Sequence, residues 1–392
     1  MEQGKEPLSS NHRCAVIAPR IFDGAHWHEK AAILVNGGRI DDLVSQMDIP
    51  ADWPQWRAPA DTFVTAGFID LQVNGGGGVL LNDVPTTNGA KTIARAHRRF
   101  GTTACLPTLI TDQRPKIEAA MAALRAASGQ DGVLGLHLEG PFISPARPGI
   151  HRPDYIRPAN MDDLDWLEPL ADAGCAMITL APECVPPGFI RALVDRGIRV
   201  AVGHSQASAE QVTRAIDEGL SGVTHLYNAM PPLAGREPGI VGATLATPSL
   251  TAGIIADGLH VDPVAIRAAF AAKGADGLAL VTDAMPTVGA SIDHFDLMGR
   301  AITLKDDKLS SADGTLAGAH LDMASAVRNA VAMAGIPLED ALRAASLTPA
   351  RFLGLDHERG RLVAGACADL VALTSRLEVV ATWIDGAIDT PV

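Results

Sequence analysis

Residues 198–233 read IRVAVGHSQASAEQVTRAIDEGLSGVTHLYNAMPPL, and this stretch decides the fold. It contains two short apolar runs, and each run ends next to a histidine, first His204 and then His225. A helical pattern lies between the runs, starting at residue 207 or 208 and ending at Gly219. An apolar run, a helix and another apolar run predict a βαβ unit of parallel sheet. In a barrel of such units, side chains at the carboxyl ends of the strands converge, so the two imidazoles are expected to share one site.

The same alternation continues on both sides of this stretch. The other apolar runs that we interpret as strands lie at 68–74, 102–109, 133–139, 175–183, 251–260 and 277–283. Together with the two runs that carry the histidines, they make eight strands, and a helical region follows to about residue 350. This number of strands and this length predict an α/β fold, namely a (β/α)8 or TIM barrel.

The two ends of the chain have a different pattern. Residues 13–65 and 360–388 contain short apolar segments broken by Gly, Asp and Pro, which is typical of antiparallel strands and turns. We therefore expect a small β-sandwich domain built from residues 1–65 and 355–392. It would lie beside a barrel domain of residues 66–354.

Composition excludes several classes of protein. The formal net charge of −13 argues against a nucleic acid or an anionic membrane as a partner. The five cysteines are scattered without a CxxC pair, which argues against a thiolate zinc site and favours a reduced, cytoplasmic location. No signal peptide is recognisable at the start of the sequence, and no apolar run reaches the length of about 18 residues needed to span a membrane.

Several loops are candidates for a functional role. The glycine run at 75–78 lacks the GK[ST] ending and the GxGxxG order of nucleotide-binding loops, so a nucleotide site is not expected there. The connections at 140–160, 226–243 and 284–320 are unusually long, as functional loops often are, and the last contains a predicted hairpin. The first is either a solvated basic loop or part of the site; its basic residues are Arg147, His151, Arg152 and Arg157.

Glu139, His204 and His225 end three of the predicted strands and offer one carboxylate and two imidazoles. Three such ligands leave one position open on a tetrahedral zinc ion, which is the catalytic rather than the structural arrangement. The open position binds water and lowers its pKa. Asp283 ends the eighth strand and is the candidate catalytic residue that takes the proton from water and returns it to a leaving group. The alternatives are histidines that are merely satisfied polar residues near the core, and an aspartate that caps a helix or forms a salt bridge at the rim.

These residues lie in motifs that resemble the amidohydrolase superfamily and, within it, the N-acetylglucosamine-6-phosphate deacetylases. The similar segments are GFIDLQVNG (67–75), HLEGPF (137–142), VGHS (202–205), THLYNAMPPL (224–233), GREPG (235–239), ADGLHVDP (256–263), VTDAM (281–285) and GTLAGA (314–319). The resemblance implies metal-dependent hydrolysis of N-acetylglucosamine-6-phosphate to glucosamine-6-phosphate and acetate, in amino-sugar catabolism or cell-wall recycling.

Two departures from the superfamily pattern bear on the metal count. Most members carry an HxH pair on the first strand, where this chain has Gln72 and Asn74. Many members with two metals also carry a bridging lysine at the end of the fourth strand, and the run at 175–183 has none. The resemblance therefore implies one divalent metal ion per subunit. Zinc is expected, and Fe²⁺, Co²⁺ and Mn²⁺ stay open.

The resemblance also implies a substrate site and an assembly. Arg236 would bind the phosphate in the neighbouring subunit's site, which implies a homodimer, and His260 would bind the substrate near the scissile group or the phosphate. A guanidinium suits a phosphate dianion. Asn228 and Ala229 would contact the sugar or its phosphate. The sugar pocket would be lined by the backbone at Ile150, Leu316, Ala317 and Gly318.

Two alternatives to this function stay open at the level of sequence. One is an amidohydrolase with another substrate, such as an N-acyl amino acid or the galactosamine isomer of the sugar. The other is a barrel that has lost catalysis. The presence of Glu139, His204, His225 and Asp283 argues against the second alternative.

Overall fold

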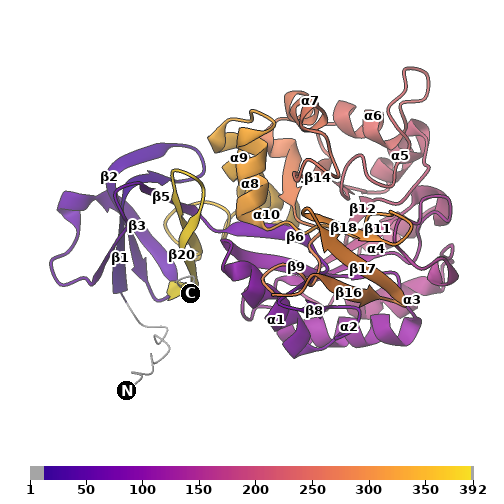
Figure 1. Ribbon diagram of the computed structural model, residues 1–392, viewed down its shortest axis with the longest axis horizontal. Coiled ribbons are helices and arrows are strands. Elements are labelled where there is room, and N and C mark those ends of the chain that lie inside the picture. Colours follow the sequence, from indigo (N-terminus) through magenta and orange to yellow (C-terminus); the bar gives the residue numbers. More distant parts are fainter. Residues whose placement is uncertain (1–12, 390–392) are drawn as a thin grey trace.

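The computed structural model describes residues 13–389. The middle of the chain forms an eight-stranded barrel, and Figure 1 shows how it is arranged beside the sheet from the two chain ends. All neighbouring strands are parallel and follow chain order. The barrel closes where Asp283 donates its backbone N–H to the carbonyl of Gln72 at 3.0 Å. This confirms the predicted (β/α)8 fold. The barrel strands are β6 (Phe68–Val73), β9 (Thr102–Ile110), β10 (Gly135–Glu139), β11 (Cys175–Leu180), β12 (Arg199–Val202), β13 (Gly222–Val223), β14 (Thr251–Ile255) and β15 (Leu278–Val281).

Helices connect and cover these strands. The helix predicted between the two histidines is α5, and it starts directly after Ser208. The Ser208 hydroxyl accepts from the N–H of Gln211, and the Gln211 side chain accepts from the N–H of Ser208. Such a capping box stabilises a helix by about 1 kcal/mol. The helices are α1 (Thr87–Arg98), α2 (Arg114–Ala127), α3 (Asp163–Leu167), α4 (Phe189–Val194), α5 (Ala209–Asp217), α6 (Gly239–Ala246), α7 (Pro263–Lys273), α8 (Met323–Ala332), α9 (Leu338–Ala345) and α10 (Leu347–Leu353).

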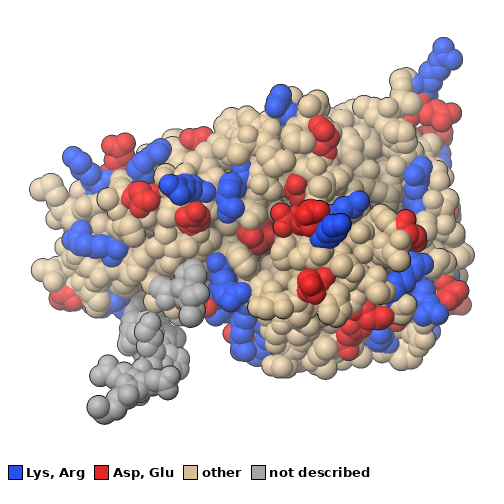
Figure 2. Space-filling view, in the orientation of Figure 1, with Lys and Arg blue, Asp and Glu red and all other residues tan. Residues whose placement is uncertain are grey.

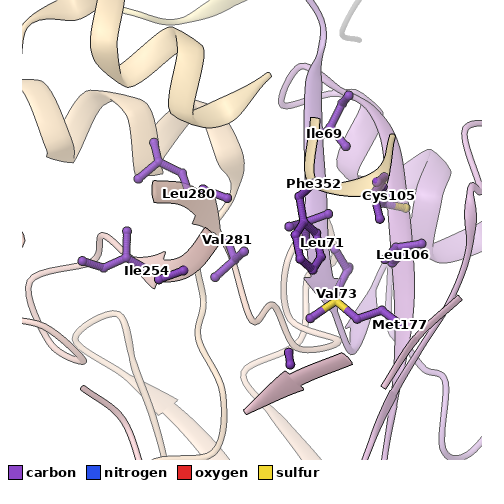
Figure 3. Packing of buried hydrophobic residues seen from close by; sticks show 14 of the residues in the cluster. Ile69, Leu71, Val73, Cys105, Leu106, Met177, Ile254, Leu280, Val281 and Phe352 are labelled. Atoms are coloured by element: carbon purple, nitrogen blue, oxygen red, sulfur yellow. The ribbon is translucent and has the colours of Figure 1, made fainter. Parts of the chain in front are cut away.

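An apolar core fills the barrel near the amino ends of its strands and the space just outside that end. Figure 3 shows Phe352 of α10 close to Leu71 of β6. The Phe352 ring also lies against Gly222 at the start of β13, where an added Cβ would come within 2.9 Å of it. Helix α10 therefore closes the amino end of the barrel. The carboxyl end is left for a site, as in other barrels of this kind.

Strands from both ends of the chain pair in one sheet beside the barrel, as predicted. Strand β19 lies antiparallel to β5 and joins the two ends, and their apolar side chains enclose a shared core. The order is β21-β20-β19-β5-β1-β2-β3, with β4 also on β1. The strands are β1 (Arg13–Phe22), β2 (Trp27–Asn36), β3 (Arg39–Ser45), β4 (Gln55–Arg57), β5 (Thr62–Ala66), β19 (Leu370–Thr374), β20 (Val379–Ile384) and β21 (Ala387–Asp389).

The expectation that these end strands are all antiparallel is wrong, because β1 runs parallel to β4 and to β5. The connection after β3 carries the chain across to the other edge of β1, so the next strands run in the same direction as β1. The domain limits at residues 65 and 355 stay a prediction. Residues 1–12 and 390–392 of the expected β-sandwich lie outside the described residues.

Two small sheets lie at the mouth of the barrel. The predicted hairpin is a three-stranded antiparallel sheet of β16 (His294–Leu297), β17 (Arg300–Lys305) and β18 (Lys308–Ser311). Its apolar side chains pack against Ile150 and Met285. The glycine run forms a short hairpin of β7 (Gly75–Gly76) and β8 (Val79–Leu80), in which a Cβ on Gly75 would lie 2.6 Å from the carbonyl oxygen of Val79. Close backbone approach therefore explains a glycine at this position.

The charged residues are dispersed over the face of the molecule that Figure 2 presents. Figure 2 shows Lys and Arg interspersed with Asp and Glu on the face that it presents, with uncharged surface between them. Within residues 13–389, no helix combines the length and the apolar character needed to cross a lipid bilayer.

Candidate active site

Three predicted ligands meet at the carboxyl ends of the barrel strands β10, β12 and β13. Glu139 is the last residue of β10, while His204 and His225 each lie two residues beyond their strands. Oε1 of Glu139 lies 3.1 Å from Nε2 of His204 and 3.0 Å from Nε2 of His225. The two Nε2 atoms are 3.1 Å apart, and all three side chains are buried. The structure thus brings together the set that the sequence proposed.

The hydrogen bonds around His204 indicate that this set suits a cation. Nδ1 of His204 lies 2.9 Å from the backbone carbonyl of Arg147, which can only accept, so Nδ1 carries the proton. In the neutral ring Nε2 then presents a lone pair to the Glu139 carboxylate, and two acceptors at this distance repel each other. Zinc bonds of about 2.0–2.1 Å in a tetrahedron place ligand atoms about 3.3 Å apart, close to the separations found here. The residues present therefore fit a divalent metal.

The Glu139 carboxylate is ionised, as a metal ligand must be. Burial by itself would raise its pKa, but when His204 and His225 are protonated, their hydrogen bonds and positive charge outweigh burial and hold the pKa well below its usual range.

The backbone is strained where the site residues leave their strands. His204, His225 and Asp283 have φ values of +48°, +31° and +50°, in the left-handed region that non-glycine residues rarely adopt. Such conformations cost about 1–3 kcal/mol each and persist only where surrounding contacts impose them. One such contact is the 2.8 Å hydrogen bond from the N–H of Ser144 to the carbonyl of His204. The strain at three site residues points to a geometry that is held for function.

Asp283 lies beside the three ligands and is held by two amides. Its Oδ1 accepts from Nδ2 of Asn74 at 2.6 Å and from Nε2 of Gln72 at 3.1 Å. The same Gln72 nitrogen donates to Oε2 of Glu139 at 3.2 Å. Burial, followed by the negative charge of Glu139, raises the pKa of Asp283 to about 6. A carboxyl group with a pKa near neutrality can both accept and donate a proton.

A cavity of about 400 Å³ opens above these residues. The predicted substrate residues that line it are Ile150, Asn228, Ala229, His260, Leu316 and Gly318. Ala317 is not among the lining residues, because its side chain is buried among the apolar side chains of the β16–β18 sheet; the expected role of its backbone stays a prediction. Arg236 lies on an exposed loop outside this chain's own cavity.

The orientation of His260 is fixed by a carboxylate. Its Nδ1 lies 2.6 Å from Oδ2 of Asp257, and the backbone N–H of His260 also donates to Asp257. Nδ1 is therefore the protonated nitrogen, and Nε2 is left to serve the cavity that His260 lines.

His151 is a site residue that the sequence interpretation left undecided. It is buried, its Nδ1 lies 2.8 Å from the Thr111 hydroxyl, and its ring centroid is 4.3 Å from that of His204. Burial and then the neighbouring His204 lower its pKa to about 3, so the ring is neutral. The alternative of a solvated basic loop is therefore wrong for this residue. The length of the 140–160 connection was the signal that could have found it.

His151 also raises the question of which three residues hold the metal. Ligand atoms of Glu139, His151 and His204 all lie within 4.8 Å of one another. The corresponding distances among Glu139, His204 and His225 are 3.0–3.1 Å. The second set is closer to tetrahedral ligand spacing, so we favour it and place His151 beside the metal site.

One carboxylate and two imidazoles at barrel strand ends, next to a carboxyl group that can exchange a proton, define a metal-dependent hydrolase. The chain belongs to the amidohydrolase family, which matches residues 63–388.

Similar proteins act on acetylated amino-sugar phosphates. The chain is 43% identical over 372 residues to N-acetylgalactosamine-6-phosphate deacetylase of Shewanella sp. (strain ANA-3), covering 94% of this chain and 93% of that protein. It is 36% identical over 360 residues to N-acetylglucosamine-6-phosphate deacetylase of Haemophilus influenzae, covering 91% and 93%. The crystal structure of N-acetylglucosamine-6-phosphate deacetylase from Pasteurella multocida superposes with a TM-score of 0.92 at 36% identity, covering 96% of this chain and 100% of that one.

Proposed function

We propose that the protein hydrolyses the N-acetyl group of N-acetylglucosamine-6-phosphate and releases glucosamine-6-phosphate and acetate. The observation that carries the proposal is the convergence of Glu139, His204, His225 and Asp283 at the floor of the cavity. Relatives that cover more than nine-tenths of the chain carry deacetylase names of this kind.

Glu139, His204 and His225 would hold one divalent ion, with zinc expected. A cation there would lower the pKa of water and polarise the acetyl carbonyl. Asp283 would take the proton from the attacking water and deliver it to the departing amine nitrogen, because amide cleavage needs a protonated leaving group. Gln72 and Asn74 hold this carboxyl group in place.

The remaining cavity residues would bind the sugar phosphate. His260 offers Nε2, and Asn228 and Ala229 present polar groups from the loop after His225. Arg236 lies on an exposed loop, which suits a guanidinium that reaches the site of a second subunit in a homodimer. Ile150, Leu316 and Gly318 line the cavity and would pack against the sugar.

The galactosamine epimer is the second candidate substrate. The observation that favours it is the 43% identity with the Shewanella enzyme, against 36% with the Haemophilus enzyme. The two sugars differ only in the configuration of one hydroxyl group, so the same catalytic residues can act on either sugar.

Acetate release from four compounds tests the proposal: the 6-phosphates of N-acetylglucosamine and N-acetylgalactosamine, unphosphorylated N-acetylglucosamine, and an N-acetyl amino acid. We expect kcat/KM for N-acetylglucosamine-6-phosphate to exceed that for the unphosphorylated sugar by about 10–100-fold, the worth of one or two charge-assisted hydrogen bonds. Faster acetate release from N-acetylgalactosamine-6-phosphate would make the galactosamine epimer the preferred substrate. No release from either phosphate would overturn the function.

Replacing Arg236 by alanine should raise KM for the phosphorylated substrate by about 10–100-fold, because a guanidinium–phosphate pair is lost. KM for the unphosphorylated sugar should not change. Steady-state kinetics with Arg376→Ala, an exposed arginine on the end sheet, give the matched control.

The shared site can be tested by mixing Arg236→Ala chains with Asp283→Asn chains. Heterodimers then contain one site with both residues intact, so activity should recover in part. An absence of recovery after verified subunit exchange would contradict a site shared between subunits.

A further inference from the structure

A second layer of polar side chains lies directly below the metal-binding residues, inside the barrel. His137 of β10 approaches the backbone carbonyl of Leu71 with Nδ1 at 3.1 Å and the Thr179 hydroxyl with Nε2 at 2.7 Å. The Thr179 hydroxyl of β11 lies 2.6 Å from that of Thr224, which follows β13. All three side chains are buried, and the proposed function uses none of them.

The direction of each hydrogen bond in this chain is determined. The Leu71 carbonyl can only accept, so Nδ1 of His137 carries a proton. A neutral ring that donates from Nδ1 offers Nε2 as an acceptor, and the Thr179 hydroxyl at 2.7 Å is the donor that reaches it. The Thr179 hydroxyl donates its single proton to His137, so its oxygen accepts a hydrogen bond from the Thr224 hydroxyl. The hydrogen bonds therefore run from Thr224 to Thr179, from Thr179 to His137 and from His137 to the Leu71 carbonyl, and each donor has an acceptor.

His137, Thr179 and Thr224 each adjoin a residue of the site above them, and Thr179 is the register partner of Glu139 on the neighbouring strand. Thr224 precedes His225, and Leu71 precedes Gln72, which donates to Glu139. His137 lies two residues before Glu139 on the same strand, hence on the same face.

The backbone next to His204 also packs against this layer. A Cβ on Gly203, the residue before His204, would come within 2.7 Å of Cγ2 of Thr179 and 3.0 Å of Cβ of Thr224. The backbone that carries this imidazole therefore lies directly on the two threonines.

We propose that the Thr224–Thr179–His137 chain is a positioning layer that sets the metal affinity of the Glu139, His204 and His225 site. Barrel interiors at this depth are usually filled by branched apolar side chains, which satisfy packing without any directional bond. Here the directional bonds tie β6, β10, β11 and the end of β13 together at one level. They thereby fix the relative positions of the three ligands before the metal binds. The inference rests on the proposed metal site.

The test is a zinc affinity measurement by competition with a chelator on purified protein, together with thermal unfolding of the metal-free form. Thr179→Val keeps the shape of the side chain and removes the link, leaving His137 Nε2 and the Thr224 hydroxyl without partners. We expect zinc affinity to fall by about 10–100-fold, as is usual when groups behind metal ligands are removed. Thr179→Ser keeps the hydroxyl and should restore the affinity to within a few-fold of the parent.

Thr103→Val is the matched control. Thr103 is a buried threonine on β9 whose hydroxyl donates to the Phe68 carbonyl at 3.3 Å, at the opposite end of the barrel. The Thr103→Val variant should have a lower thermal stability than the parent and an unchanged zinc affinity. If Thr179→Val binds zinc as tightly as Thr103→Val does, the positioning layer is refuted. If Thr179→Val does not fold, Thr224→Val decides in the same way, because it removes the first donor of the chain. A parent protein that binds no metal would instead refute the proposed function.

Discussion

Replacing Asp283 by asparagine is expected to lower turnover by about 10²–10⁴-fold, the usual worth of a positioned acid–base group. Asparagine keeps the shape and the possibility of hydrogen bonds to Gln72 and Asn74, but it cannot carry the proton from water to the amine. Metal content and product affinity should survive the change, because Asp283 is not one of the three proposed ligands. The measurements are kcat, metal content, and product binding by calorimetry.

The pH dependence gives an independent readout of Asp283. The base must be ionised, so the parent rate should fall on the acid side as the carboxylate is protonated, and this limb should be absent from the residual activity of Asp283→Asn. Asp293→Asn, at an exposed aspartate before β16, is the control and should retain the parent profile. If Asp283→Asn kept more than about a tenth of normal turnover, the proton transfer would have to be reassigned, and His260 would be the next candidate.

The second large effect concerns the metal. The purified protein should contain about one tightly bound divalent ion per chain, because Gln72 and Asn74 offer weak amide ligands and are already bound to Asp283 and Glu139. His204→Ala or Glu139→Ala should lose both the metal and measurable activity, since three protein ligands leave none to spare. Elemental analysis and acetate release are the measurements.

His294→Ala is the matched control for the ligand variants, because this histidine is exposed on β16. It should keep both the metal and the activity. Removing the metal from the parent protein with a chelator should abolish activity, and adding zinc should restore it. Two stoichiometric metals per chain in the protein as purified would contradict the single-metal site.

Much of the architecture could be predicted because it follows from local patterns. The start of α5 depends on Ser208 and Gln211, which are three residues apart, and both are readable in the sequence. The alternation of apolar runs and helices defined the barrel, and the barrel placed the strand ends together. His204, His225 and Asp283 were identifiable for that reason, as was the absence of an HxH pair on the first strand.

The parts that could not be predicted depend on contacts between distant residues in segments without periodicity. The carbonyl of Arg147 fixes the tautomer of His204 across 57 residues of sequence, and His151 enters the site from the same irregular loop. The parallel pairing of β1 with β5 depends on the path of a connection rather than on the composition of either strand.

The sequence by itself determined the barrel, the joining of both chain ends and the nature of the proposed catalytic groups, because hydrophobic periodicity and strand-end positions are local properties. Tertiary structure alone decided the distances among Glu139, His204 and His225, the bridging of Glu139 and Asp283 by Gln72, and the buried chain from Thr224 to His137. These contacts join side chains from different strands. Their geometry is set by the stagger and closure of the barrel, which no single segment of the chain encodes.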